Sequence, residues 1–560
     1  MKFTMLMLEI RSGVPGFSGS YSEGIASIAA VVKDVGHEFE LIHVTRPTSA
    51  EKLAERVAET KPDAVGYSCM THTFPYLKAF APAIKRALPN VPTLMGGVHA
   101  ILNPQESIEV EGIDAVCLGE GESVMLPFLE RIEQGRSFED VTGLFVNHNG
   151  NIHHNAARPL VVNLDSLPMP DRSVFDFSKL VTTREGVLYV FASRGCPYQC
   201  PFCSNHAIRS QAPNSKDYLR YKGVARVCEE IEIAASHFPG KLRGLYFQDE
   251  ILTMNLAWFS EFANVYPQRI GIPFNCNLRA DLVSERTADL LQKSGCNSVS
   301  IGVESGVERI RHLVVGKNIT DAVFGQAFER LHVRGIGVNT FNMIGLPGET
   351  PADALETVFF NADSKVDKNM VSIFCPYPGT KLHKISMDAG ILSPSMSDTF
   401  QDYSPLAQST ISGSQVRFIH DFFKEIVFLK RSRWPGAALR EPLIRYVEHD
   451  GLTMKVLSRS KRTARFLLTV PYLLVGRYLF NRQSRVFKAP AGVPRPARRP
   501  EVGRREKQIP QLVQIELGSG IASGIGPKLV PDRRGEWEIS GLPRQSSGAS
   551  PKLKPGARCT

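Results

Sequence analysis

The sequence predicts an α/β protein with two successive α/β units, a helical segment and a tail. Residues 1–160 alternate short apolar runs with helical patterns, which is typical of an open, doubly wound (Rossmann-like) parallel sheet. After a linker (161–183), six strand-like runs within 184–400 predict a partial (β/α)6 barrel of the TIM type. A basic helical segment follows at 401–487, and the Pro-, Arg-, Gly- and Ser-rich residues 488–560 predict a disordered tail.

The first unit contains five runs with the length and apolar character of buried parallel strands. Glycine-rich turns follow the first, fourth and fifth of these runs. Ligands of such sheets bind at the carboxyl ends of the strands, so three such turns at one edge favour a ligand site over ordinary turns. The runs are 3–10, 38–44, 63–69, 91–97 and 113–119, and helical patterns cover 22–36, 49–61 and 76–89.

The second unit begins after prolines and acidic residues break the periodicity around Asn163–Asp176. Each of its strand-like runs ends in polar or glycine-rich residues. A (β/α) barrel carries its active site at those carboxyl ends, so we expect the functional residues there. The runs are 187–195, 243–250, 273–281, 298–306, 337–349 and 370–380.

Composition excludes several classes of protein. A content of 43% hydrophobic and 22% charged residues is typical of a soluble globular chain. The net charge of +10 does not indicate a nucleic-acid binder, because the basic excess lies entirely after Val416. The N-terminal run is too short for a signal peptide, and Glu9 interrupts it. We therefore expect a reducing cytoplasm, where clustered cysteines indicate metal binding or catalysis rather than disulfides.

Three cysteines, Cys196, Cys200 and Cys203, lie in a C-x-x-x-C-x-x-C loop directly after the first strand of the second unit. Three thiolates on one loop can hold three corners of a cubane iron–sulfur cluster and leave the fourth iron open. Two alternatives remain. A zinc site could recruit His206, although the spacing strains a tetrahedron, and a redox C-x-x-C pair would leave Cys196 without a role. The position at a strand end favours the cluster.

With Phe202 before its last cysteine, this loop resembles the signature of the radical S-adenosylmethionine (SAM) enzymes. The similarity runs from about Leu188 to Thr380. It implies that the three cysteines bind a [4Fe–4S] cluster, that FQDE meets the methionyl amine of SAM, and that GLPGE lies beside the adenine. The implied SAM contacts are Phe202, Asp249, Glu250, Arg279 (methionyl carboxylate), Glu304 (ribose) and Gly345.

The resemblance also implies a mechanism. The open iron would chelate SAM, and an electron from the cluster would cleave it to methionine and a 5′-deoxyadenosyl radical that abstracts hydrogen from an unactivated carbon. We therefore expect no catalytic side chain beyond the cofactor site, and an external one-electron reductant of the flavodoxin or ferredoxin type. The alternative for the accessory residues is that they are ordinary strand-end carboxylates, with Arg279 as their ion-pair partner.

The first unit resembles the cobalamin-binding domain that precedes the barrel in one branch of this superfamily. The matching stretches are GGVHAILNP and LGEGE. The D-x-H-x-x-G motif that supplies a histidine to cobalt in many cobalamin proteins is absent, so the resemblance implies cobalamin bound without a lower histidine ligand. A domain that kept the fold and lost the cofactor is the alternative. The implied cobalamin contacts are Gly96, Gly97, His99, Gly119, Glu120, Gly121 and Glu122.

Near the C-terminus, Arg465–Phe480 is strongly apolar and flanked by basic clusters. Pro471 and Arg477 interrupt it, and it is too short for a spanning helix. We expect a buried helix that covers the barrel. The alternative is an interfacial segment that contacts anionic lipid at the inner face of the membrane, which would favour a lipid-like or otherwise hydrophobic small-molecule substrate.

Together these features predict a cobalamin-dependent radical SAM enzyme, with methylation of an unactivated carbon as the leading hypothesis. One alternative is a non-methylating radical reaction, such as oxidative cyclisation of a porphyrin or a rearrangement. Another is a cobalamin-binding or redox-sensing protein without catalysis. The motifs at successive strand ends argue against a sensor, because a sensor needs no SAM contacts.

Overall fold

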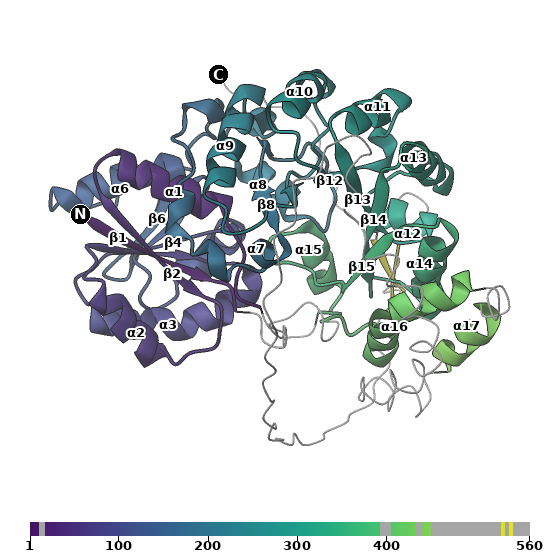
Figure 1. The fold of residues 1–560 in the computed structure, drawn as a ribbon. Coiled ribbons are helices and arrows are strands. Elements are labelled where there is room, and N and C mark those ends of the chain that lie inside the picture. Colours follow the sequence, from purple (N-terminus) through teal and green to yellow (C-terminus); the bar gives the residue numbers. More distant parts are fainter. Residues whose placement is uncertain (11–16, 393–404, 433–439, 450–527, 532–536, 541–560) are drawn as a thin grey trace, which may run out of the picture.

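The computed structural model describes residues 1–10, 17–392, 405–432, 440–449, 528–531 and 537–540. Figure 1 shows two α/β units side by side, followed by helices at the far side of the second unit. The predicted fold class is confirmed. The apolar stretch Arg465–Phe480 lies outside the described residues, and in the described part no helix is long and apolar enough to cross a membrane.

The first sheet has seven strands in the order β2–β1–β3–β4–β5–β6–β7. The five predicted strands are its parallel members β1–β5, and β6 and β7 extend the sheet antiparallel. Asn149 and Gly150, both with positive φ, form the two-residue turn between β6 and β7. The strands are β1 (Lys2–Leu8), β2 (Glu38–Val44), β3 (Ala64–Ser68), β4 (Thr93–Gly96), β5 (Ala115–Cys117), β6 (Leu144–His148) and β7 (Asn151–His154).

Helices cover both faces of this sheet (Figure 1). Residues of α1 and α6 pack against one face and residues of α2 and α3 against the other, in two separate buried clusters. Ser22 and Ser49 start α1 and α2, because each hydroxyl accepts a hydrogen bond from an N–H of the first turn. The helices are α1 (Glu23–Asp34), α2 (Ala50–Glu59), η1 (Thr71–Thr73), α3 (Phe74–Ala87), α4 (Val98–Leu102), α5 (Pro104–Ile108) and α6 (Gly121–Glu133).

The linker folds as three single turns of 3-10 helix. Asn163, Asp171 and Asp176 cap these turns through their side-chain oxygens, which explains the acidic and polar residues seen in the sequence. The turns are η2 (Leu164–Ser166), η3 (Arg172–Val174) and η4 (Phe177–Lys179), and α7 (Val181–Glu185) leads into the second unit.

The second sheet is parallel, with the order β15–β14–β13–β12–β11–β8. Each strand pairs with the strands before and after it in this series, and the sheet curls. Because β8 and β15 do not pair with each other, the sheet is a half-barrel and not a closed barrel. All six predicted strands are confirmed. They are β8 (Val187–Val190), β11 (Gly244–Phe247), β12 (Phe274–Leu278), β13 (Cys296–Glu304), β14 (Gly337–Ile344) and β15 (Lys368–Ile373).

Helices cover the outside of the half-barrel and enclose its largest buried cluster. Four rings from β11, α10 and β12 pack edge-on or stacked at its centre, with centroids 4.6 to 6.3 Å apart. The helices are α9 (Val224–Ser236), α10 (Leu256–Arg269), η6 (Ala280–Leu282), α11 (Glu285–Lys293), α12 (Glu308–Leu313), α13 (Asp321–Val333) and α14 (Pro351–Asp363).

Between β8 and α9 the chain makes a two-stranded ribbon that carries the cysteine loop. The loop joins β9 (Ser193–Arg194) to α8 (Ser204–Gln211), and β10 (Arg220–Tyr221) returns antiparallel to β9 after η5 (Ser215–Asp217). The ribbon brings Arg220 opposite Arg194.

Helix α15 (Lys381–Asp388) ends the described part of the second unit, and the predicted helical segment 401–487 contains α16 (Gly413–Arg431) and α17 (Arg440–Glu448). Ser412 and Gln415 form a capping box at the start of α16, which packs on α14. Of the predicted tail, the described residues form two short paired strands, β16 (Lys528–Pro531) and β17 (Trp537–Ser540); the rest of the tail lies outside the described residues.

Candidate functional site

The cysteine loop starts in a conformation that requires glycine. Gly195 has a φ of +92°, and a Cβ there would lie 2.1 Å from the carbonyl oxygen of Tyr218. This close approach fixes where Cys196 begins the loop. Cys196, Cys200 and Cys203 are free thiols.

The three thiols lie within electrostatic reach of one another. Burial, with smaller contributions from Cys203, Glu250 and Cys200, raises the pKa of Cys196 to about 11. Burial and Cys200 likewise raise the pKa of Cys203. Iron would stabilise the thiolates that burial disfavours, so this donor set fits an iron–sulfur cluster.

Among the described residues, no three His, Cys, Asp or Glu side chains are arranged around one metal ion. A [4Fe–4S] cluster requires no such common point, because each thiolate binds a different iron atom. His206 is the residue that the zinc alternative would need as fourth ligand. Its ring nitrogen Nδ1 is buried and has no hydrogen-bond partner among the described residues.

Elements of the half-barrel hold the loop from several sides. The guanidinium of Arg279, at the end of β12, stacks over the ring of Tyr198 at 3.6 Å. Phe202 packs against the buried cluster that contains Met343 and Leu346. The N–H of Leu382 on α15 donates to the carbonyl of Pro201 at 3.0 Å. The structure therefore places Arg279 at the loop that contains Phe202, and contact of either residue with SAM remains a prediction.

The two carboxylates of the FQDE motif do different things. Asp249 is fully buried and accepts hydrogen bonds from the N–H of Ala192, at 3.1 Å, and from the hydroxyl of Ser193. Burial raises the pKa of Asp249 to about 6. Glu250 instead accepts from the side-chain amide of Asn205 at 3.0 Å, beside the cysteines. Glu250 thus lies at the loop, and Asp249 supports the strand that enters it; contact of either with SAM remains a prediction.

Glu304 lies at a break in the register of β13 and β14. Its φ is +66°, which is unusual for a residue other than glycine and marks local backbone strain. Its carboxylate pairs with Nζ of Lys317 at 2.7 Å, and Lys317 also donates to the carbonyl of Gly302. The sequence predicted a ribose contact at Glu304 but did not reveal its partner Lys317, because Lys317 lies in the loop after α12 and not at a strand end.

Gly345 also lies at a strand end, with a φ of +88°. Its N–H and that of Leu346 donate to Oε2 of Glu349, at 2.5 and 3.2 Å. Glu349 is fully buried, its Oε1 meets no hydrogen-bond partner among the described residues, and burial raises its pKa to about 8. A protonated Glu349 therefore shapes the turn that presents Gly345.

The carboxyl edge of the first sheet gathers the residues from GGVHA. A Cβ on Gly97 would lie 2.6 Å from the carbonyl of Cys69, so the backbones of β3 and β4 meet here. His99 is buried, with Nδ1 3.2 Å from the hydroxyl of Thr71. Burial lowers the pKa of His99 to about 4. Its Nε2 makes no hydrogen bond within the described residues.

This edge adjoins the cysteine loop. Helix α4 contacts α8 directly after the loop, and Gly379, in the loop after β15, approaches the carbonyl of Leu102 closely. Met70 and Val98 expose apolar side chains at this edge. Nε2 of His99 lies 3.7 Å from a carboxylate oxygen of Glu106, beyond hydrogen-bond distance. An apolar edge with a buried ring nitrogen that makes no hydrogen bond among the described residues fits a large flat cofactor with polar side arms such as cobalamin.

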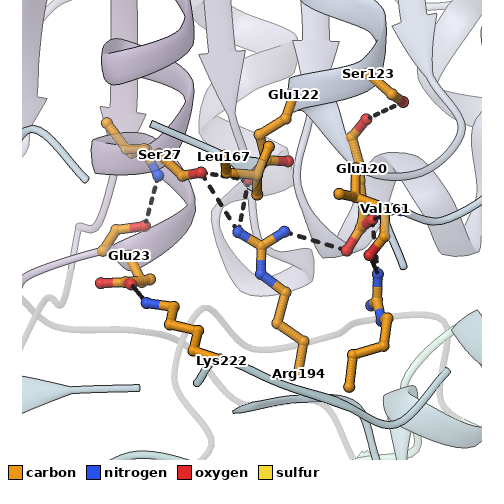
Figure 2. A network of polar contacts seen from close by, with 12 residues as sticks. Glu23, Ser27, Glu120, Glu122, Ser123, Val161, Leu167, Arg194 and Lys222 are labelled. Carbon is orange, nitrogen blue, oxygen red and sulfur yellow. Dashed lines mark hydrogen bonds and ion pairs between the residues drawn. The ribbon is translucent and has the colours of Figure 1, made fainter. Parts of the chain in front are cut away.

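Gly119, Glu120, Gly121 and Glu122 lie where β5 leads into α6, and the two carboxylates bind the second unit (Figure 2). Arg194 donates to Glu120 at 3.1 Å and to Glu122 at 2.7 Å. Gly121 approaches Ile28 of α1 closely, whereas Gly119 has open space around its Cα. The structure thus occupies both carboxylates with protein cations, and their contact with cobalamin remains a prediction.

Sequence reasoning also missed Arg194 and Glu349. Arg194 precedes the glycine of the cysteine loop, and Glu349 ends the GLPGE motif, so both stood inside stretches already singled out. Their roles depend on partners far away in the chain or on burial, which the local pattern does not reveal.

A cavity of about 630 Å³ lies between the linker and α9. None of the predicted site residues lines it. The charged residues of its wall, Asp171, Arg172, Asp176 and Glu230, are each engaged by other protein groups.

Residues 20–128 match the family model of the B12 binding domain, and residues 190–360 match that of the radical SAM superfamily. The chain belongs to the B12-binding radical SAM enzymes. The predicted cofactor set of [4Fe–4S] cluster, SAM and cobalamin is thereby confirmed for the family, while the contacts of individual residues remain predictions.

Curated relatives of this radical SAM enzyme include an uncharacterised methyltransferase of Pyrococcus horikoshii, 26% identical over 70% of this chain and 84% of the relative. An anaerobic magnesium-protoporphyrin IX monomethyl ester cyclase of Rubrivivax gelatinosus is 26% identical over 77% of this chain and 80% of the relative.

Among solved structures, the radical SAM methyltransferase TsrM from Kitasatospora setae, solved with cobalamin and a [4Fe–4S] cluster, aligns with a TM-score of 0.57. It is 17% identical and covers 72% of this chain and 79% of its own. OxsB, a cobalamin-dependent SAM radical enzyme, aligns with a TM-score of 0.61 at 16% identity, over 80% of this chain and 72% of its own. These two likenesses concern the fold.

Proposed function

We propose that this radical SAM enzyme methylates an unactivated carbon of a small molecule, using cobalamin. The observation that carries the proposal is the contact between the two ligand edges. Helix α4, at the carboxyl edge of the B12-binding sheet, packs on α8, which begins directly after Cys203. Both cofactors would therefore face one shared space. The methyltransferase name of the Pyrococcus relative supports the same reaction.

When bound, the cluster supplies the electron that cleaves SAM, and cobalamin supplies the transferable methyl group. The residues of the chain bind and orient these groups. Cys196, Cys200 and Cys203 would hold the cluster. Arg279 already donates through Nε and Nη2 to Asp281, at 3.1 and 3.0 Å, and its guanidinium lies against Tyr198. Its Nη1 would therefore be the donor that meets the carboxylate of SAM.

The remaining predicted contacts complete the SAM site in this proposal. Glu250 would accept from the methionyl amine, since it already lies beside the cysteines. Glu304, held by Lys317, would accept from the ribose hydroxyls. Gly345 leaves room for the adenine, because its positive φ and missing side chain let the ring approach the backbone.

The second candidate function is oxidative cyclisation of a porphyrin. It is favoured by the cyclase of Rubrivivax gelatinosus and by a second relative of that name, from Cereibacter sphaeroides, at 27% identity over 68% of this chain. Cyclisation needs the radical and an oxidant, but it transfers no methyl group. For either reaction we propose a hydrophobic substrate and an external reductant of the flavodoxin or ferredoxin type. We also propose that the protein contacts the inner face of the membrane.

The test is anaerobic reconstitution with iron, sulfide, cobalamin and SAM labelled in its methyl group. Methyl transfer consumes SAM twice, once as methyl donor and once as radical source, so it yields S-adenosylhomocysteine and 5′-deoxyadenosine together. We expect both products in comparable amounts and label in an acceptor from a cell extract. 5′-Deoxyadenosine without S-adenosylhomocysteine would instead indicate cyclisation or rearrangement. Formation of neither product would contradict the proposal and would indicate a sensor without catalysis.

A further inference from the structure

Arg194 bridges the two units at the point where the cysteine loop begins (Figure 2). Its guanidinium donates through Nη1 to Glu120 at 3.1 Å and through Nη2 to Glu122 at 2.7 Å. Glu122 also accepts from the hydroxyl of Ser27 on α1 at 2.6 Å. Nη2 of Arg194 also donates to the hydroxyl of Ser27 at 3.4 Å. One side chain, two residues before Cys196, therefore contacts both α1 and the first turn of α6.

Two more cations from the same ribbon join this contact. Arg220, opposite Arg194 in the ribbon, donates to Glu120 at 2.9 Å. Lys222 donates to Glu23 of α1 at 2.7 Å. Lys222 and Arg220 are both buried, so these ion pairs are shielded from solvent.

The ribbon is fixed on its other side by the half-barrel. Asp249, at the end of β11, binds the backbone of Ala192 and the side chain of Ser193. A continuous chain of contacts thus runs from the end of β11, through Arg194, to the loop that leads into α6. This chain of contacts passes through Ser193 and Arg194, whose backbone leads directly into the cysteine loop.

We propose that Arg194 is a positioning residue that fixes the cysteine loop relative to the B12-binding unit. This inference rests on the proposed function, because it assigns the residue that sets the distance between the radical source and the methyl carrier. Arg194 touches neither reacting atoms nor a predicted cysteine ligand. Its planar fork reaches two carboxylates at once, which a single ammonium group cannot do in the same geometry.

The first test uses the apo protein, so it does not depend on cofactor loading. A genetically encoded, spin-labelled amino acid replaces Lys52 on α2 and Gln326 on α13, which are both exposed. Pulsed EPR then measures the distance between the two units. We expect a broader or shifted distance distribution in Arg194→Gln than in the wild type, and an intermediate one in Arg194→Lys.

Arg334→Gln is the matched control, because Arg334 also binds two carboxylates, Glu285 and Asp289, each at 2.7 Å, but within the second unit. It should leave the distribution as in the wild type. A wild-type distribution in Arg194→Gln, or equal broadening in Arg334→Gln, overturns the proposal. If Arg194→Gln does not fold, Arg194→Lys decides by the same comparison.

The second test uses the reconstituted enzyme. A 1 Å misplacement of reacting groups can lower a rate by about a hundredfold, so Arg194→Gln should raise the ratio of 5′-deoxyadenosine to methylated product about tenfold or more. Arg194→Lys should restore part of the coupling. An unchanged ratio at equal iron and cobalamin content overturns the positioning role. Failure of the wild type to bind cobalamin would instead count against the proposed function and leave the apo distance measurement intact.

Discussion

Nζ of Lys317 lies 2.7 Å from Oε1 of Glu304, and the two side chains are only 9% and 11% exposed. Glu304 holds this position with a backbone φ of +66°. The ion pair therefore joins a strained strand end of the half-barrel to the loop after α12. It presents one carboxylate at the edge where the SAM site is proposed.

Removing Lys317 alone should be more harmful than removing both charges. Lys317→Met leaves the Glu304 carboxylate buried without its cation, which costs on the order of 3 to 5 kcal/mol when a buried pair is broken. In the double variant Lys317→Met/Glu304→Gln no buried charge remains, so most of that stability returns. Urea unfolding of the apo protein measures both. A double variant as unstable as the sum of the two single variants would contradict the pairing.

Replacing Cys200 with Ala should abolish stable cluster assembly, because one of three predicted ligands is lost. Cys228→Ala is the matched control, since Cys228 is also a buried free thiol but lies on α9. We expect the control to keep wild-type iron content and SAM cleavage, and Cys200→Ala to lose SAM cleavage at least a hundredfold, roughly the scale of losing a positioned reacting group. Iron analysis and 5′-deoxyadenosine formation check both variants.

Gly195→Ala should displace the cysteine loop. A left-handed backbone costs a non-glycine residue about 1–2 kcal/mol, and here the new Cβ would also meet the carbonyl of Tyr218 at 2.1 Å. Gly240→Ala separates the two effects, because Gly240 has a φ of +98° with no atom of the described residues within 4 Å of its Cβ. Both variants should lower the melting temperature. Only Gly195→Ala should lower iron uptake, and equal uptake in the two would refute the close contact.

Glu349→Gln should change how stability depends on pH. Burial raises the pKa of Glu349 from 4.5 to about 8 in the folded chain. The folded state therefore binds an extra proton between these values, and this residue lowers wild-type stability as pH rises through that window. Glutamine does not ionise, so the stability of the variant relative to wild type should rise from pH 5 to pH 8, by up to about 1.4 kcal/mol per unit. Urea denaturation of the wild type and the variant from pH 5 to pH 8 measures this difference, and a difference that stays constant would contradict the raised pKa of Glu349.

The sequence predicted the strands well because parallel strands buried on both faces read as short apolar runs. Val187–Val190 and Gly244–Phe247 could be located in this way, as could the polar residues that follow them. Cys196, Phe202 and Arg279 were brought together as expected, because the carboxyl ends of neighbouring strands converge. Local pattern and topology sufficed for this part of the site.

The hairpin of β6 and β7 was missed although its signal was present. Asn149–Gly150 is a strong two-residue turn between alternating residues. It lies outside the alternation of strands and helices from which the parallel sheet was predicted. The two-residue strands β9 and β10 leave no periodic pattern, so the ribbon could not have been predicted in that way.

The ion pairs between the units could not be predicted for another reason. Glu120 and Arg220 are 100 positions apart, and nothing near either residue specifies the other. The resemblance of LGEGE to the cobalamin-binding domain implied that Glu120 and Glu122 contact cobalamin. Which partner a carboxylate takes at such an edge is decided by the docking of the second unit.

The two arginines that face each other across the ribbon have a consequence for how this protein can be divided. Arg194 and Arg220 repel each other as neighbours, and the carboxylates that compensate their charge belong to the other unit. A half-barrel expressed alone would keep three cations of the ribbon without their cross-unit counter-charges. Two separate family models match the two units, but these ion pairs join the units in the folded protein. A gene fusion that exchanges the first unit would therefore have to carry Glu23, Glu120 and Glu122 with it.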